Sequence, residues 1–173
     1  MTAQLQTPTL AAGRWAVSDS RTRVTFTVSN LGRTVHGSVS CSGGHVQIDD
    51  TGAPVGVAAE LDLDSIDTGI AKRDADLRGP RLLDIDRAPA MTWSADRFIR
   101  HDDGSWSAEG QLSLRGTSTP LTVTGKPEAG NGTSIRVRAC TVLDRRSVGI
   151  RAPRFLIGRI IGIEIDAWLT PVR

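Results

Sequence analysis

The chain has 173 residues, with 21 lysines and arginines against 19 aspartates and glutamates, for a formal net charge of +2. This length is enough for one domain with a sizeable hydrophobic core. The near balance of charge argues against a nucleic-acid-binding protein, which normally presents a clustered basic face. No apolar run approaches the roughly 20 residues that a membrane-spanning helix needs, so we expect no integral membrane segment.

The N-terminal stretch MTAQLQTPTLAAGRW lacks the basic region and the continuous apolar region of a secretory signal. The sequence therefore predicts a cytoplasmic protein. Residues 1–12 are small and polar without periodicity, and we expect them to form a flexible tail. Residues 13–173 are then expected to form a single domain.

From residue 15 onward, apolar and polar residues alternate with a period of two, which predicts β-strands. RVTFTV places Val24, Phe26 and Val28 on one face, and VHGSVSC and HVQI continue the pattern as two further strands. VGVAAELDL, MTWSADRF, SWSAEGQLSL, PLTVTG, TSIRVRACTVL and IIGIEIDAWL follow, separated by turn-forming clusters such as SGGH and EAGNGT. Gly43 and Gly44 are expected in a hairpin turn that requires positive φ.

Residues 69–86 interrupt the alternation. Ile70, Asp74 and Leu77 recur at helical spacing, and Gly79 with Pro80 ends the predicted helix. Ser65 or Asp67, with Thr68 and Gly69, is expected to end the preceding strand and to cap this helix. Eight to ten antiparallel strands, each with one apolar and one polar face, predict an all-β fold. We favour a closed, extended antiparallel barrel of about eight strands with a short helical insertion.

Five aspartates within LDLDSIDTGIAKRDADL suggest a calcium loop, but the spacing contradicts this. Measured from Asp62, the fifth, sixth and twelfth positions of an EF-hand loop would be Ile66, Asp67 and Arg73. Asp62 and Asp64 are instead predicted to lie on the outer face of a strand. The sequence therefore predicts no metal site here.

The remaining reactive residues give no catalytic signature. His36 and His45 are expected on successive strands that could approach one another, and no third ligand follows at a zinc-like spacing. No nucleophile elbow or phosphate-binding loop is present in the sequence. Cys41 and Cys140 could form one bridge, although two small thiols on strands are the simpler reading. We therefore expect no catalytic residues and no cofactor.

The alternation also predicts which side chains point into the barrel. Branched aliphatic residues dominate this set, which suits a flexible hydrocarbon better than a planar cofactor. The predicted interior residues are Phe26, Leu61, Leu63, Met91, Trp93, Leu112, Leu114, Ile135, Val137, Phe155, Ile163 and Ile165.

Several segments, in order, resemble the YceI-like family of lipocalin-like polyisoprenoid-binding proteins. They are RWAVSDSRTRVTFTVSNLGRTVHGSV, SIDTGIAKRDADLRGPRLLDIDRAP, MTWSA, GQLSLRGTSTPLTV, RRSVGI and IGIEIDAWL, which together span about residues 14–170. The sequence departs from the family pattern at Asp76, where the family has histidine, and at Leu82 and Leu83, where it has phenylalanines. It also departs at Ser147 and Val148, in place of an acidic and an aromatic residue.

The resemblance implies a barrel that binds, sequesters or transports a polyisoprenoid or a related long-chain amphiphilic lipid. An isoprenoid lipid or an isoprenoid quinone is the expected partner, and the chain could form a homodimer. We expect Arg73, Asp74, Leu77 and Arg78 to contribute to the ligand site, with the three charged residues near the barrel mouth. Two alternatives stay open: a filled barrel acting as a stress-response or interaction protein, and an enzyme acting on an apolar substrate in the same cavity.

Overall fold

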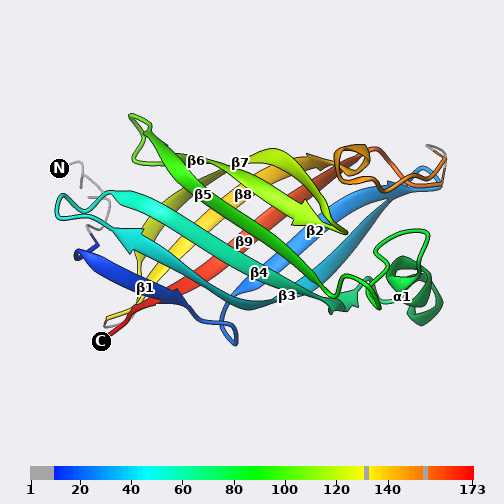
Figure 1. Ribbon diagram of the computed structural model, residues 1–173, viewed down its shortest axis with the longest axis horizontal. Helices are drawn as coiled ribbons and strands as arrows, with labels where there is room; N and C mark the ends of the chain where they lie inside the picture. The colour runs from blue at the N-terminus through cyan, green and yellow to red at the C-terminus, as the bar shows by residue number, and fades with distance from the viewer. Residues whose placement is uncertain (1–9, 131–132, 154–155) are drawn as a thin grey trace, which may run out of the picture.

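The structure, a computed structural model, describes residues 10–130, 133–153 and 156–173. Long antiparallel strands account for most of these residues (Figure 1). The strands are β1 (Gly13–Val17), β2 (Arg23–Asn30), β3 (Arg33–Ile48), β4 (Pro54–Asp67), β5 (Ala90–Arg100), β6 (Trp106–Leu114), β7 (Thr117–Ala129), β8 (Ile135–Asp144) and β9 (Ile160–Pro171). A short helix, α1 (Ala71–Arg78), and a 3₁₀ turn, η1 (Arg145–Val148), complete the elements of the described ranges.

The strands close into a barrel. Each strand from β2 to β9 pairs with its chain neighbour, including β4 and β5, which α1 separates in the sequence, and β2 pairs with β9 to complete the ring. β1 pairs with the C-terminal ends of β3 and β9. β2 pairs with the N-terminal parts of the same two strands. β1 and β2 therefore share one position, so the nine strands form an eight-position antiparallel barrel, as the alternation predicted.

The expected alternation of faces is found along most strands. Val24 on β2 and Leu63 on β4 are buried, while Asp62 and Asp64, on either side of Leu63, are exposed on the outer face. The interior therefore collects branched aliphatic side chains, because each inward position of a strand lies two residues from the next. The prediction that Asp62 and Asp64 lie outside the barrel is confirmed.

One predicted hairpin does not exist. β3 continues without a turn through Gly43 and Gly44, and neither glycine has a positive φ. A Cβ atom at Gly44 would lie 2.7 Å from the carbonyl oxygen of Ala58 on β4. Glycine is thus required by the close approach of β4 near a register shift at Cys41, rather than by a turn.

The prediction that His36 and His45 lie on successive strands is also wrong, because β3 has no turn between them. His36 and His45 both belong to β3 and are nine positions apart, which corresponds to roughly 30 Å along a strand. They cannot share a ligand. His45 Nδ1 lies 3.2 Å from an Arg14 guanidinium nitrogen, and His101 Nε2 lies 2.6 Å from Ser107 Oγ.

Helix α1 follows the end of β4 as predicted, but its cap differs from the expected one. Ile70 precedes the helix without a capping side chain, and Asp67 accepts a hydrogen bond from the Gly69 amide at 2.8 Å instead. Asp74, from within the helix, reaches back and accepts from the Thr68 amide at 3.0 Å. This contact holds the helix against the strand exit. Figure 1 shows α1 at one end of the barrel, and β1 with the C-terminus at the other.

Two groups of buried residues divide the interior. The larger group fills the α1 end and consists of Leu63, Ile66, Leu83, Leu112, Leu114, Leu143, Val148 and Ile150. The smaller group lies at the opposite end and consists of Leu10, Trp15, Ile48 and Leu169. Leu10 is therefore packed although it falls within the predicted tail, and the Trp15 indole donates to the Ala11 carbonyl at 2.9 Å. The space between the two groups positions the candidate site.

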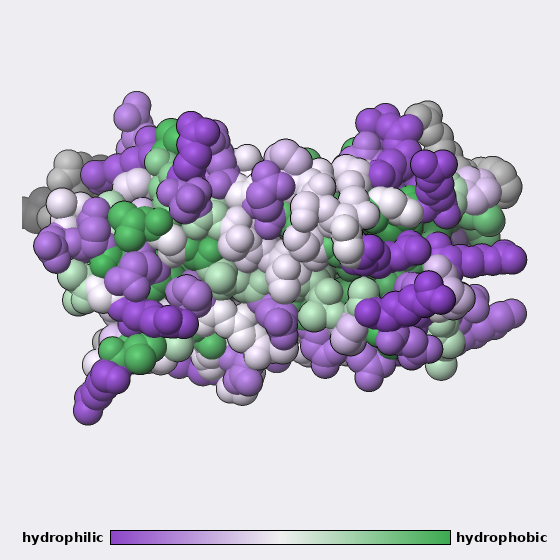
Figure 2. Space-filling view, viewed as in Figure 1, coloured by the Kyte–Doolittle hydropathy of each residue, from purple (hydrophilic) through white to green (hydrophobic). Residues whose placement is uncertain are grey.

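The outer surface is uneven in polarity. Figure 2 shows strongly hydrophilic residues gathered towards the two ends of the elongated molecule and paler residues over its middle. Within the described part of the chain, no helix is both long enough and apolar enough to cross a membrane.

Candidate functional site

An apolar cavity of about 540 Å³ lies inside the barrel between the two buried groups. This volume is within the usual range of small-molecule sites. Seven of the predicted interior residues line it: Leu61, Met91, Trp93, Leu112, Val137, Ile163 and Ile165. Sequence alternation therefore identified a substantial part of the wall.

Other predicted interior residues lie elsewhere. Leu63 and Leu114 belong to the packed core at the α1 end, and Phe26 and Leu77 pack against that core. Ile135 packs against the group at the opposite end. Phe155 lies outside the described residues. The α1 end of the barrel is thus filled by protein side chains rather than by a cavity.

The charged residues expected at the mouth are not there. Arg73 donates to the Thr68 hydroxyl at 2.7 Å, and Arg78 donates to the Ile66 carbonyl at 3.0 Å. These contacts are at the Asp67 end of β4, whereas the cavity reaches Pro54 at its other end. Fourteen residues of strand separate the two ends by roughly 45 Å. Arg73, Asp74 and Arg78 therefore do not line this cavity.

Asp74 has a structural role at the α1 end. Burial alone would raise the pKa of its carboxyl group, but hydrogen bonds from Thr68 and the charges of Arg78 and Arg73 outweigh burial and lower it. The carboxylate therefore stays ionised and links the helix to the strand exit.

Phe98 and Arg100 are among the residues of the wall that the sequence pattern missed. Strict alternation from Met91 and Trp93 would turn Arg97 inward. A register shift between Ala95 and Arg97 inserts one extra residue, so that Phe98 and Arg100 take the inward positions.

Gly110 lies opposite this bulge. A Cβ atom there would lie within 2.2 Å of the Ser94 carbonyl oxygen and 2.8 Å of Ala95 Cβ. An isolated glycine in a strand pattern is a typical sign of a bulge or a close backbone approach, and it is the signal that could have located this one.

Most polar groups of the wall are already paired within the protein. Thr141 Oγ1 donates to the Thr122 carbonyl at 2.8 Å, and Thr22 Oγ1 accepts from the Trp168 amide at 3.2 Å. The Cys41 thiol donates to the Gly43 carbonyl, and burial raises its pKa. Cys41 and Cys140 are both free, with Cys41 buried and Cys140 exposed.

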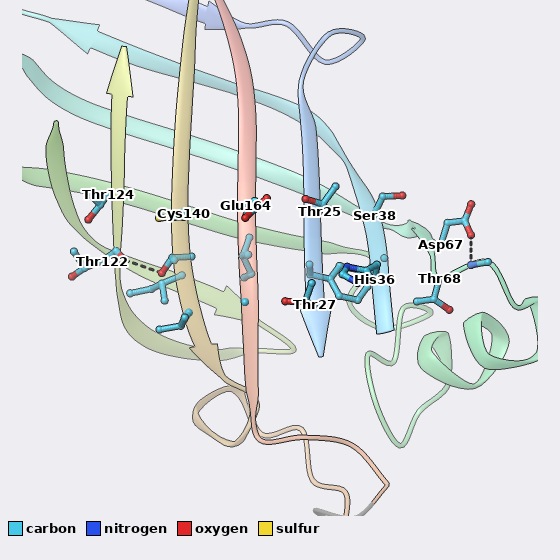
Figure 3. A pocket seen from close by; sticks show the side chains of 18 of the residues that line it. Thr25, Thr27, His36, Ser38, Asp67, Thr68, Thr122, Thr124, Cys140 and Glu164 are labelled. Carbon is cyan, nitrogen blue, oxygen red and sulfur yellow. Dashed lines mark hydrogen bonds between the residues drawn. The ribbon is translucent and has the colours of Figure 1, made fainter. Parts of the chain in front are cut away.

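A second depression lies on the outside of the barrel. It has a volume of about 1170 Å³ and crosses β7, β8, β9, β2 and β3. Figure 3 shows its small polar side chains in a row across these strands, including Thr122, Thr124, Cys140, Thr25 and Thr27. Although this groove is larger, it is more open to solvent than the cavity and its lining is more polar, so it offers a smaller hydrophobic gain to a ligand.

The groove and the cavity come close to one another. Leu121, Thr141 and Ile163 line both. β7 and β8 pair from Ala129 and Ile135 as far as Thr124 and Cys140, and then separate. The hydrogen bond from Thr141 to the Thr122 carbonyl spans the place where they separate.

A closed antiparallel barrel with an apolar interior cavity defines the class of small lipocalin-like β-barrel proteins. Residues 15–169 match the model of the YceI-like domain. Because this match covers most of the chain, the protein belongs to the YceI-like family, which confirms the resemblance noted in the sequence.

Relatives by sequence include a UPF0312 protein of Yersinia pestis (strain Pestoides F), 30% identical over 105 residues. The aligned part covers 60% of this chain and 54% of the relative, so the match spans about half of that protein's length.

Solved structures with a similar fold include Burkholderia cenocepacia BcnA, with a TM-score of 0.77 at 15% identity, covering 88% of this chain and 98% of that one. A polyisoprenoid-binding domain from Saccharophagus degradans, implicated in plant cell wall breakdown, has a TM-score of 0.69 at 13% identity, covering 91% and 98% of the two chains. The Campylobacter jejuni YCEI protein has a TM-score of 0.68 at 14% identity, covering 78% and 82%. At these identities the similarity establishes the fold.

Proposed function

We propose that the protein binds an isoprenoid lipid, or a related single-chain amphiphile, inside the barrel cavity and sequesters or carries it without chemical change. The observation that supports this most strongly is the apolar cavity between the two buried groups. The polyisoprenoid-binding neighbour supports the same class of ligand. A barrel filled throughout by its own side chains, the alternative left open by the sequence, is disfavoured by this cavity.

The cavity volume also limits the length of the ligand. If each non-hydrogen atom needs about 30 Å³, the volume that one water molecule has in the liquid, 540 Å³ holds roughly 18 such atoms. A chain of three isoprene units fits this space. A much longer polyisoprenoid would have to extend beyond the barrel or displace the packed core at the α1 end.

Binding of such a chain needs no directed polar contact along its length. At about 0.8 kcal/mol for each buried CH₂ group, 15 carbons give a gross gain on the order of 12 kcal/mol. Association costs estimated at about 4–15 kcal/mol offset part of this gain, so the fit of the cavity decides the net affinity.

A pair of adjacent substitutions on β8 tests where the lipid binds. Ala139 lines the interior cavity, and Cys140 lines the outer groove. Ala139→Leu adds bulk inside the barrel, whereas Cys140→Leu adds similar bulk outside. We expect Ala139→Leu to weaken the binding of farnesol about tenfold, while Cys140→Leu binds it like the unaltered protein.

The measurement is calorimetric titration with farnesol, after circular dichroism has shown that both variants are folded. Weaker binding by Cys140→Leu alone would place the ligand in the outer groove and contradict the proposal. Failure of the unaltered protein to bind farnesol, combined with the absence of any lipid in organic extracts of the purified protein, would reject lipid binding altogether.

A further inference from the structure

Arg100 occupies an unusual place at one end of the cavity. It is the last residue of β5, and it lines the cavity together with Gly104 of the following turn. Thr51 and Gly52, from the turn between β3 and β4, line the same end. Figure 1 shows both turns at the end of the barrel opposite α1. Since Arg100 is also exposed, its side chain lies at the mouth, between the apolar cavity and solvent.

Arg100 is the one charged side chain among the described residues that line the cavity. Arg97, three residues earlier and on the outer face, lies 3.5 Å from Glu109 in an ion pair. Within the described ranges, Arg100 has no hydrogen bond or ion pair with another side chain. The nearby Asp103 accepts hydrogen bonds from the amide and the hydroxyl of Ser105, at 2.9 and 2.6 Å.

Trp106 adds a second donor at the same place. It is the direct cross-strand partner of Arg100, and it also lines the cavity. The indole groups of Trp15 and Trp93 donate to the carbonyl oxygens of Ala11 and Leu121. The indole N–H of Trp106 has no such acceptor within the part of the chain that the structure describes.

The guanidinium group of Arg100 and the indole N–H of Trp106 can donate hydrogen bonds but cannot accept them. A guanidinium group offers five N–H donors and no acceptor, and an indole N–H is only a donor. A partner for both must therefore supply oxygen acceptors, and a negatively charged partner would also match the charge of the guanidinium group. Placed at the mouth of an apolar cavity, this pair suits the head group of a lipid whose chain lies inside.

We infer that Arg100, with Trp106, binds an anionic oxygen head group, a phosphate or a carboxylate, of a single-chain lipid. The inference rests on the proposed function, because it needs the hydrocarbon chain in the cavity. It replaces the charged residues near α1 as the head-group site. It also predicts an orientation, with the head group at the end of the barrel opposite α1 and the tail directed towards the packed core.

The test compares a charged ligand with its neutral counterpart. Farnesyl phosphate and farnesol share one hydrocarbon chain, and palmitate supplies a carboxylate. The proteins are the unaltered chain, Arg100→Gln, and Arg97→Gln as the matched control on the outer face of the same strand. Calorimetric titrations at low salt measure the affinity of each protein for each ligand.

We expect the unaltered protein and Arg97→Gln to bind farnesyl phosphate about tenfold more tightly than farnesol, since hydrogen bonds to a charged group are stronger than neutral ones although solvent weakens them at an exposed site. Arg100→Gln should lose this preference and keep its affinity for farnesol. In 1 M salt the preference should shrink for the unaltered protein and for Arg97→Gln, because screening then acts within about 3 Å.

The outcomes separate the two proposals. If the affinities for farnesyl phosphate and for palmitate are both independent of Arg100, the head-group assignment is overturned and lipid binding is left intact. Failure of all three ligands to bind overturns the proposed function as well. An Arg100-dependent affinity for palmitate but not for farnesyl phosphate supports the assignment and identifies a carboxylate as the head group.

Discussion

Replacing Arg145 with methionine should cause a large loss of stability. Arg145 is only 2% exposed, and its guanidinium group donates to four carbonyl oxygens in the segment that follows η1. The acceptors, with their distances, are Gly158 at 3.0 Å, Ile150 at 2.9 Å, Ala152 at 2.7 Å and Ile157 at 3.0 Å. This side chain therefore holds residues 150–152 and 157–158, between β8 and β9, to one another.

The magnitude follows from the fate of these four carbonyl groups. Methionine fills part of the space but donates nothing. The Ile150 bond is buried, and leaving such an acceptor unpaired costs about 1–3 kcal/mol. The other three bonds are only partly buried, so water can replace them at a smaller cost. Removal of the buried charge offsets some of this loss. We expect a net loss of about 3 kcal/mol, a large share of the roughly 5–15 kcal/mol by which domains are stable.

Urea unfolding followed by circular dichroism measures this loss. With a slope of about 2 kcal/mol per molar urea, the midpoint should fall by about 1.5 M. Arg146→Met is the matched control, because Arg146 is exposed and its guanidinium lies 3.5 Å from Asp144, and we expect a change below about 0.5 kcal/mol. A loss below about 1 kcal/mol in Arg145→Met would show that the four hydrogen bonds contribute less to the free energy of unfolding than their geometry indicates.

Two further predictions concern the same end of the barrel. Leu114 is 1% exposed within the larger buried group, so Leu114→Ala should destabilise the protein by about 2–5 kcal/mol in urea unfolding, and a change below about 1 kcal/mol would mean that the core repacks. The hydrogen bond from Arg159 to Asp144 lowers the pKa of that carboxyl group from 3.8 to about 2. Because the folded-state pKa is the lower one, this contribution to stability is present above pH 3.8 and is lost as pH falls towards about 2. Arg159→Gln should reduce this acid-dependent part of the unfolding free energy, and an unchanged pH profile would contradict the assignment.

The sequence alone determined the local features of the molecule. Period-two alternation placed Val24, Leu61 and Ile163 on the inward face, and SIDTG marked the exit from β4 into a helix. These features follow from sequence because the direction of each side chain depends on its own position in a strand and on its nearest neighbours. The apolar stripe on every strand likewise required closure around a common interior.

Only the tertiary structure decided which end of the barrel is filled and which residues form the mouth. The bulge that turns Arg100 inward depends on how β5 and β6 pair, and the passage of β3 through Gly44 depends on the approach of Ala58 from β4. Both features arise between residues that are distant along the chain, so alternation within one strand cannot reveal them. For that reason the sequence predicted part of the cavity wall but not the inward position of Arg100 at the end of β5.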